Sequence, residues 1–129
     1  MRTIDGKLAL ITGAAAGIGR AVALEFAGQG ADLLRVDIDR VGLAYNAAAA
    51  RGRQVRVETC VADLGSPLEV ARVAAWVRDR HGRLDILVNN AAVAYYGYTH
   101  EMAADQCDRV FAVNLRAPMQ LTHELMPCL

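Results

Sequence analysis

Several residue types are scarce in this sequence of 129 residues, and each scarcity excludes a class of protein. Cysteine occurs three times, an odd number with no CxxC or Cys/His ligand spacing, which argues against a disulfide framework and against a metal site. The 14 basic residues are balanced by 14 acidic ones, and no basic cluster is interleaved with aromatics. A nucleic-acid partner therefore has no electrostatic support.

Long hydrophobic runs are also absent. No uncharged apolar run approaches the about 18 residues that span a bilayer, and the N-terminus contains no apolar signal-peptide region. We therefore expect no membrane partner and a soluble, cytoplasmic protein. The length suits a single domain, residues 1–129, which is large enough to bury a core.

What the sequence does contain is a glycine-rich segment directly after an apolar run at residues 8–11. The segment reads Thr12-Gly13-Ala14-Ala15-Ala16-Gly17-Ile18-Gly19, and a helical spacing of apolar residues follows it. Glycine permits positive φ and close approach of the backbone to a ligand, while the N–H groups and dipole at a helix N-terminus attract a pyrophosphate. The order strand, glycine turn, helix predicts the first turn of a nucleotide-binding βαβ unit.

The rest of the chain alternates between apolar strands and helical patterns. Continuous apolar runs indicate strands buried on both faces, and Ser66-Pro67-Leu68-Glu69 is a strong helix start. We predict strands at 7–12, 32–37, 55–59 and 84–89, and helices at 17–29, 40–51, 67–81 and 103–126. This order predicts an α/β protein with a Rossmann-like, doubly wound parallel sheet, truncated after the fourth strand and its following helix.

The last predicted helix carries two apolar stripes. One stripe contains Val110, Val113, Ala117, Leu121 and Leu125, and the other contains Phe111, Leu115, Met119 and Met126. Two stripes require two packing partners, and the fourth strand would form an unpaired edge of the sheet in this chain. We therefore expect the chain to associate with itself.

Five motifs follow one another along the chain: Thr12-Gly13-x-x-x-Gly17-x-Gly19, Asp37, Asp63-Leu64, Asn89-Asn90-Ala91-Ala92 and Val113-Asn114. With these motifs at these spacings, residues 6–129 resemble the N-terminal, cofactor-binding half of a short-chain dehydrogenase/reductase. The resemblance implies that the dinucleotide phosphates bind at the turn formed by Thr12, Gly13, Gly17, Ile18 and Gly19.

The same resemblance assigns roles to residues after the third and fourth strands. It implies that the Asp63 side chain binds the adenine amino group, with Leu64 beside the ring. It also implies that Asn90, Ala91 and Ala92 approach the nicotinamide ribose, although Ala92 stands where the family usually has glycine. A methyl group is tolerated there if φ is negative, so the assignment stands.

The second predicted strand ends in the residue that bears on cofactor choice. Asp37 lies 20 positions after Gly17, where a carboxylate accepts hydrogen bonds from an adenosine ribose and repels a 2′-phosphate. Ala16 stands where relatives that prefer NADP often carry a basic residue. Arg40, just past the strand, would meet a 2′-phosphate if Asp37 turned aside. We predict NAD as the cofactor, with NADP less favoured.

Asn114 is the one candidate for a catalytic role. Pro118, four residues later, has no N–H to donate to the Asn114 carbonyl. The resemblance implies that this carbonyl holds a water in a proton relay to a catalytic lysine, and a purely structural kink is the alternative. The family's catalytic serine and Tyr-x-x-x-Lys pair are absent from this sequence, in which Lys7 and Ser66 are the only residues of their kinds.

Three functions remain open at this point. The resemblance implies an NAD(P)-dependent oxidoreductase that transfers a hydride between the dinucleotide and a small alcohol or carbonyl substrate, with this chain inactive on its own. A module that binds a dinucleotide without turnover is the second. A self-associating protein without a ligand is the third.

Overall fold

The computed structural model describes residues 3–51 and 54–129 and shows a four-stranded parallel sheet with helices on both faces. The strands are β1 (Leu8–Thr12), β2 (Asp32–Asp37), β3 (Val57–Val61) and β4 (Ile86–Val88). The α-helices are α1 (Gly17–Gly28), α2 (Arg40–Arg51), α3 (Pro67–His81), α4 (Ala104–Phe111) and α5 (Ala117–Leu125). The predicted α/β, Rossmann-like parallel fold is thereby confirmed.

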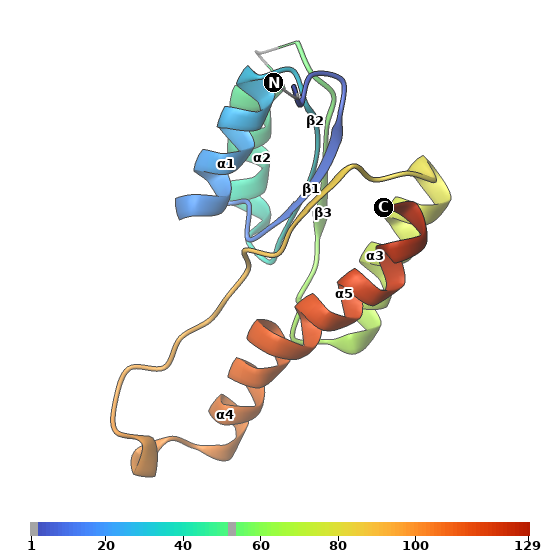
Figure 1. Ribbon diagram of the computed structural model, residues 1–129. Helices are drawn as coiled ribbons and strands as arrows, with labels where there is room; N and C mark the ends of the chain where they lie inside the picture. The colour runs from blue at the N-terminus through green and yellow to red at the C-terminus, as the bar shows by residue number, and fades with distance from the viewer. Residues whose placement is uncertain (1–2, 52–53) are drawn as a thin grey trace.

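The sheet has the order β3-β2-β1-β4, with all three pairs of neighbouring strands parallel. β1 pairs with β2 on one side and with β4 on the other, and every one of its residues is buried. This position explains its continuous apolar run, because a strand covered on both faces has no solvent side for polar residues. The carboxyl ends of the strands lie together at the lower side of the sheet in Figure 1.

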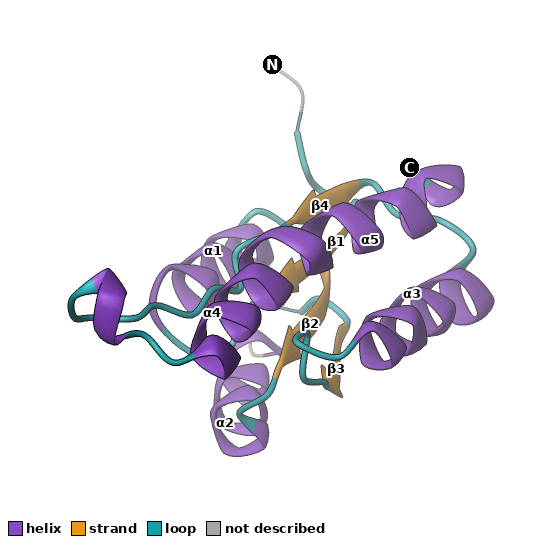
Figure 2. Cartoon of the chain, turned by 90° about the horizontal axis from the view of Figure 1, so that it is seen from below, coloured by secondary structure: helices purple, strands orange, loops and turns teal. Residues whose placement is uncertain are grey.

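Helices lie on both faces of the sheet, α1 and α2 on one face and α3 and α5 on the other (Figure 2). Each face has its own hydrophobic core. Alternate residues of a strand point to opposite faces, so Leu8 and Leu10 pack toward α3 and α5, while Ala9 and Ile11 pack toward α1 and α2. The α3–α5 side contains the larger cluster, to which α5 contributes Ala117, Leu121 and Leu125. The structure is therefore a three-layer sandwich of helices, sheet and helices.

Local signals in the sequence place helix α3 where it was predicted. The Ser66 hydroxyl accepts a hydrogen bond from the Glu69 N–H at 3.4 Å, and Pro67 occupies the first helical position. At the other end, Gly82 takes a left-handed conformation with φ of 68°. Strand β3, in contrast, begins and ends two residues later than 55–59, because pairing places Val57 opposite Leu33 of β2.

The last helical region, predicted for 103–126, is interrupted near Asn114, where the sequence predicts a missing hydrogen bond. A π-helical segment, η2 (Ala112–Arg116), separates α4 from α5, and a 3₁₀ turn, η3 (Met126–Cys128), follows α5. Pro118 explains the interruption, since it cannot donate the α-helical hydrogen bond to the Asn114 carbonyl. A further 3₁₀ turn, η1 (Thr99–Glu101), lies in the loop before α4, which extends away from the sheet (Figure 1).

None of the helices in residues 3–51 and 54–129 combines the length and the apolar character needed to cross a bilayer.

Candidate functional site

The carboxyl ends of the strands bring most of the predicted site residues together. A pocket of about 110 Å³ lies there. Its lining includes six of those residues, Gly13, Asp37, Asp63, Leu64, Ala91 and Ala92. Its volume is below the about 300 Å³ typical of small-molecule sites, so it fits one portion of a dinucleotide rather than the whole molecule.

The glycine turn after β1 requires each of its glycines for a different reason. Gly13 has a φ of 65°, and a Cβ atom there would lie 2.8 Å from Asn90 Nδ2 and 2.9 Å from Ala91 Cα. Gly17 has a φ of 55° and faces open space, so only its conformation demands glycine. Gly19 is buried, and a side chain there would collide with the Gly13 carbonyl. The turn thus folds tightly back on itself before α1.

Helix α1 begins without a side-chain cap. Its N-cap residue is Ala16, in an extended conformation, and no acidic residue occupies its first turn. The first N–H groups of a helix have no partner within the helix. The N–H groups of Gly17, Ile18 and Gly19, together with the positive end of the helix dipole, therefore suit an anionic ligand.

Thr12 and Asn90 join the ends of β1 and β4. The Thr12 hydroxyl donates to the Val88 carbonyl at 3.4 Å and accepts from the N–H groups of Asn90 and Ala91, both at 3.0 Å. The Asn90 side-chain amide donates to the carbonyls of Thr12 and Gly13 at 3.1 and 3.2 Å. Thr12 is only 2% exposed, so it supports the turn from beneath.

Asp37 lies beside the glycine turn, and both of its carboxylate oxygens accept backbone hydrogen bonds. Oδ2 accepts from the Ala15 N–H at 2.9 Å, and Oδ1 accepts from the Asp39 N–H at 3.0 Å. The carboxylate is thereby held at the wall of the pocket that it shares with Gly13. Arg40, three residues later in the sequence and the first residue of α2, is exposed.

The Asp63 carboxylate is paired with an arginine that is not among the site residues predicted from the sequence. Arg109 of α4 approaches both oxygens through Nη1, at 2.8 Å to Oδ1 and 2.9 Å to Oδ2, and Oδ1 also accepts from the Gly65 N–H at 2.9 Å. The two residues are 46 positions apart, so no local spacing indicates their contact. Leu64, next to Asp63, is buried in the core and also lines the pocket.

Asn114 connects the π-helical segment η2 to the loop after β4. Its side-chain Oδ1 accepts from the Val93 N–H at 2.8 Å, and its Nδ2 donates to the Val93 carbonyl at 2.7 Å. This paired contact fixes the backbone just beyond Ala92. The side chain therefore has a structural role, separate from the relay role predicted for its carbonyl.

Within the described ranges, no group of three or more His, Cys, Asp or Glu side chains is arranged to hold a metal ion. The arrangement is instead that of an α/β domain with a nucleotide-type site. A tight glycine turn, an uncapped helix N-terminus and a strand-end carboxylate meet at the carboxyl edge of a parallel sheet. This combination defines the class of dinucleotide-binding, Rossmann-like domains.

Comparison with known proteins gives the family. The family model described as short chain dehydrogenase matches residues 7–129. Oxidoreductase UcpA of Escherichia coli strain K12 is 37% identical over 98% of this chain and 48% of its own length. The 3-oxoacyl-[acyl-carrier-protein] reductase FabG of Thermotoga maritima is 34% identical over 96% of this chain and 50% of its own. The chain belongs to the short-chain dehydrogenase/reductase family of oxidoreductases and spans about half the length of these relatives.

Solved structures agree with this assignment. A metagenomic short-chain oxidoreductase in complex with NADP superposes with a TM-score of 0.93 at 33% identity, covering 98% of this chain and 58% of that one. A short-chain dehydrogenase/reductase from Burkholderia phymatum in complex with NAD gives 0.92 at 31% identity, covering 100% of this chain and 46% of that one. The fold described above is thus shared with one structure solved with NADP and one solved with NAD.

Proposed function

We propose that this chain binds a nicotinamide dinucleotide across the carboxyl ends of its strands, as part of an NAD(P)-dependent oxidoreductase. The glycine turn and the N-terminus of α1 would hold the phosphates, and Asp37 would hold the adenosine ribose. Asp63 and Leu64 would contact the adenine, and residues 90–92 would lie near the nicotinamide ribose. The observation that carries the proposal is the Asp37 carboxylate, fixed by the Ala15 N–H beside the turn.

We further propose that NAD is preferred over NADP. A negative charge at the position of Asp37 repels the 2′-phosphate of NADP, and Ala16 supplies no compensating cation. Titration with NADH and NADPH, followed by fluorescence, tests both proposals. Asp37→Asn keeps an acceptor oxygen and removes the charge, so it should reduce the preference for NADH about tenfold, or about 1.4 kcal/mol.

Asp39→Asn is the matched control for that experiment. Asp39 is an exposed carboxylate two residues further on, whose Oδ1 accepts from the Gly42 N–H at 3.0 Å. Its substitution should leave the ratio of the two affinities unchanged. An equal change in both variants would show that Asp37 does not select the cofactor, and no saturable binding of NADH to the native chain would refute the dinucleotide site.

The bound dinucleotide would supply the hydride acceptor or donor, with a small alcohol or carbonyl compound as the substrate. The only serine and the only lysine of this sequence have other contacts. Ser66 caps α3, and Lys7 forms an ion pair with Asp85 at 3.5 Å. We propose that the Asn114 carbonyl, opposite Pro118, holds a relay water, and that turnover requires acid–base groups other than those of residues 1–129. A chain that binds NADH and also oxidises alcohols on its own would contradict this view.

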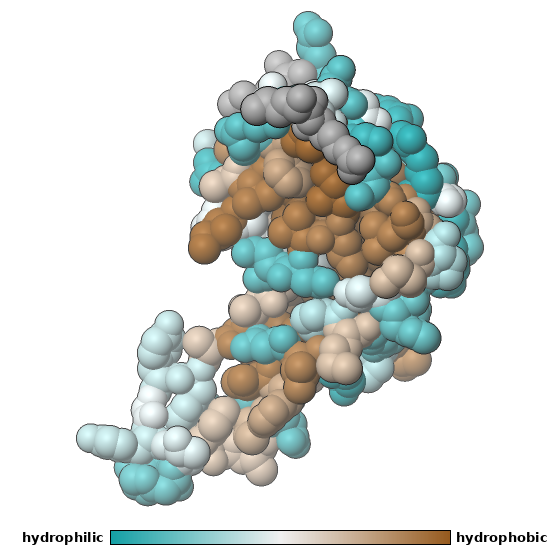
Figure 3. All heavy atoms as spheres, in the orientation of Figure 1, coloured by the Kyte–Doolittle hydropathy of each residue, from teal (hydrophilic) through white to brown (hydrophobic). Residues whose placement is uncertain are grey.

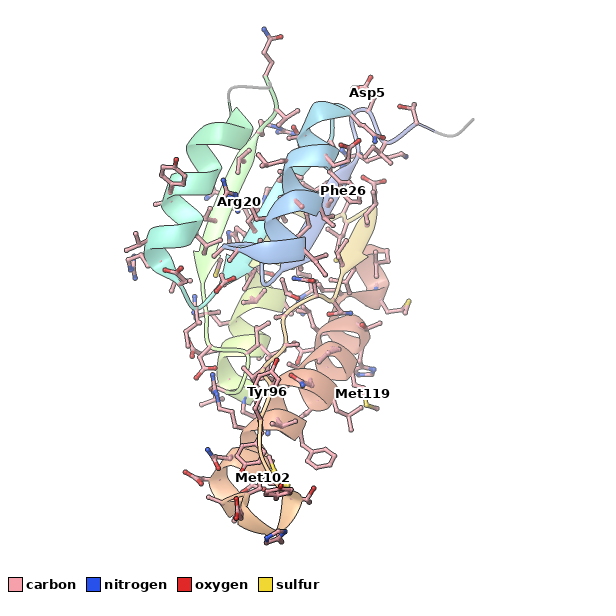
Figure 4. All side chains as sticks on the ribbon, turned by 90° about the vertical axis from the view of Figure 1, so that its left-hand side faces the viewer. Asp5, Arg20, Phe26, Tyr96, Met102 and Met119 are labelled. Carbon is pink, nitrogen blue, oxygen red and sulfur yellow. The ribbon has the colours of Figure 1, made fainter. Side chains whose placement is uncertain are left out.

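A second proposal concerns self-association. Of the two stripes predicted on the last helical region, the first is mostly buried: Ala117, Leu121 and Leu125 belong to the core, Val113 is buried and Val110 is half-buried. The second stripe lies on the surface. The exposed stripe consists of Phe111, Leu115, Met119 and Met126, which are 60%, 52%, 65% and 58% exposed. Figure 3 shows apolar side chains over the region of α4 and α5. Met119 lies on the outer side of α5 in Figure 4. The stripe borders a groove of about 690 Å³.

We propose that a second copy of the chain covers this stripe, since contiguous apolar surface of this kind marks association sites. Sedimentation velocity at micromolar concentration should show a dimer or larger species for the native chain. Met119→Glu should shift it toward monomer. Leu68→Glu, on an exposed leucine of α3 outside the stripe, is the control and should leave the oligomeric state unchanged. A native chain that is monomeric would refute the proposal.

A further inference from the structure

Arg35 is a charged residue in the middle of the sheet with no exposure to solvent, 0% by relative area. Its neighbours on β2, Leu34 and Val36, belong to the core on the α3–α5 side, so Arg35 faces α1 and α2 with Leu33. Burial lowers the pKa of the Arg35 guanidinium, and the charge of Asp37 opposes this effect. Arginine nevertheless keeps its charge in proteins. A full positive charge is therefore buried in one of the two cores.

The guanidinium reaches the glycine turn. Arg35 Nη2 donates to the Ala14 carbonyl, and Nη1 donates to the Leu43 carbonyl of α2 at 3.5 Å. The peptide group between Ala14 and Ala15 is thus held at both ends by side chains of β2, its carbonyl by Arg35 and its N–H by Asp37 at 2.9 Å. The turn takes its orientation from the second strand as well as from its own glycines.

Core packing gives no reason for this charge. Among the described residues no carboxylate forms an ion pair with Arg35, and its Nε has no hydrogen-bond partner. A buried charge without a close counter-charge is costly, and an apolar side chain such as that of Leu33 fills the same face of the strand without this cost. Another cation, Arg20, lies on α1 near α2 (Figure 4) and lowers the pKa of Arg35 further. Asp37 is the carboxylate whose charge acts on Arg35, but it forms no ion pair with the guanidinium and accepts two backbone N–H groups instead. The counter-charge within the described residues is therefore incomplete.

We propose that the buried Arg35 guanidinium forms the floor of the phosphate-binding turn. It holds the Ala14 carbonyl inward, and it places a positive charge behind the N–H groups of α1 that face the ligand. An anionic phosphate above the turn supplies a counter-charge in addition to that of Asp37, so the guanidinium strengthens binding of phosphates and not of the nucleoside. Arg35 is a positioning residue, and this inference rests on the dinucleotide binding proposed above.

The test compares ligands with phosphates, NADH and ADP, with adenosine, which has none. The native chain, Arg35→Met and Arg35→Lys are titrated with NADH by fluorescence, and ADP and adenosine are then used as competitors. Arg35→Met should weaken NADH and ADP about tenfold, as expected for losing a charged interaction, and adenosine less than about twofold. Arg35→Lys, which keeps the charge, should recover most of the ADP affinity. Leu33→Met, a volume-conserving change on the same face, is the control and should change none of these values.

The outcomes distinguish the two proposals. Binding of ADP to Arg35→Met as tightly as to the native chain overturns the role of Arg35 but leaves the dinucleotide site intact. An equal loss of ADP and adenosine affinity also overturns it, because a purely packing role affects both ligands. If circular dichroism shows Arg35→Met to be unfolded, Arg35→Gln replaces it as the neutral variant. Failure of the native chain to bind NADH overturns the proposed function and this inference together.

Discussion

Replacing Gly13 with alanine should damage both the stability of the chain and its affinity for NADH. Gly13 has a φ of 65°, and the left-handed region costs a residue with a Cβ atom about 1–2 kcal/mol. The new Cβ would also lie 2.9 Å from Ala91 Cα, a backbone atom that cannot rotate away. Overpacking of this kind costs about 1–3 kcal/mol, so the total loss should be about 2–5 kcal/mol.

Gly6→Ala isolates the first of these contributions, the conformational strain. Gly6 has a φ of 70°, but nothing lies within 4 Å of a Cβ atom built there. It precedes the amino end of β1, whereas the site lies at the carboxyl ends of the strands. It should therefore lose only the about 1–2 kcal/mol of conformational strain. Each kcal/mol corresponds to a fall of about 3–6 °C in Tm for a domain of this size.

Thermal unfolding followed by circular dichroism, together with NADH titration, gives the comparison. We expect Gly13→Ala to melt below Gly6→Ala and to bind NADH at least about tenfold more weakly, because Ala91 and the turn must shift to admit the methyl group. Gly6→Ala should bind NADH as the native chain does. Equal melting temperatures, or unchanged NADH affinity of Gly13→Ala, would refute the assignment of this glycine to the site.

Three further predictions concern other parts of the molecule. The hydrogen bond from the first N–H of β1 lowers the pKa of Asp85 below its usual 3.8, so its contribution to stability is present above that pH and is lost as pH falls below it. Unfolding of Asp85→Asn at pH 7 and pH 3 should therefore show a smaller loss on acidification than unfolding of the native chain. Asn114→Ala removes both hydrogen bonds to Val93, which should cost about 1–2 kcal/mol and speed proteolysis of the loop after β4. Arg109→Met should change Tm little, because half-exposed ion pairs contribute only about 0–1 kcal/mol to stability. It should alter the affinity for NADH, because the Asp63 carboxylate loses its arginine partner. An unchanged Kd for NADH would show that Arg109 has no influence on the site.

The local features of this protein could be predicted from the sequence. The strand 32–37, the start of α3 and the glycine turn depend on residues close together along the chain, which is why composition and spacing predict them. The same holds for the interruption near Asn114, because Pro118 lacks an N–H in any context. The parallel sheet with helices on both faces also followed from the alternation of strands and helices, whereas the strand order β3-β2-β1-β4 was seen only in the structure.

Contacts between distant residues were decided only by the tertiary structure. The pairing of Asp63 with Arg109 has no local signal, and neither does the use of the Thr12 hydroxyl to bind the backbone of β4. Two equally apolar stripes on one helix could not be ranked from the sequence, because burial depends on which one faces α3.

The sequence by itself determined that a strand, a glycine turn and a helix follow one another, because backbone conformation there depends on neighbouring residues. It did not reveal that Arg35, which stands in an otherwise apolar strand, lies fully buried with its guanidinium on the Ala14 carbonyl of that turn. Only the packing of β2 beneath the turn brings the two together. The tertiary structure thus decided which charges act on the site, since electrostatic interaction depends on distance in space and not on separation along the chain.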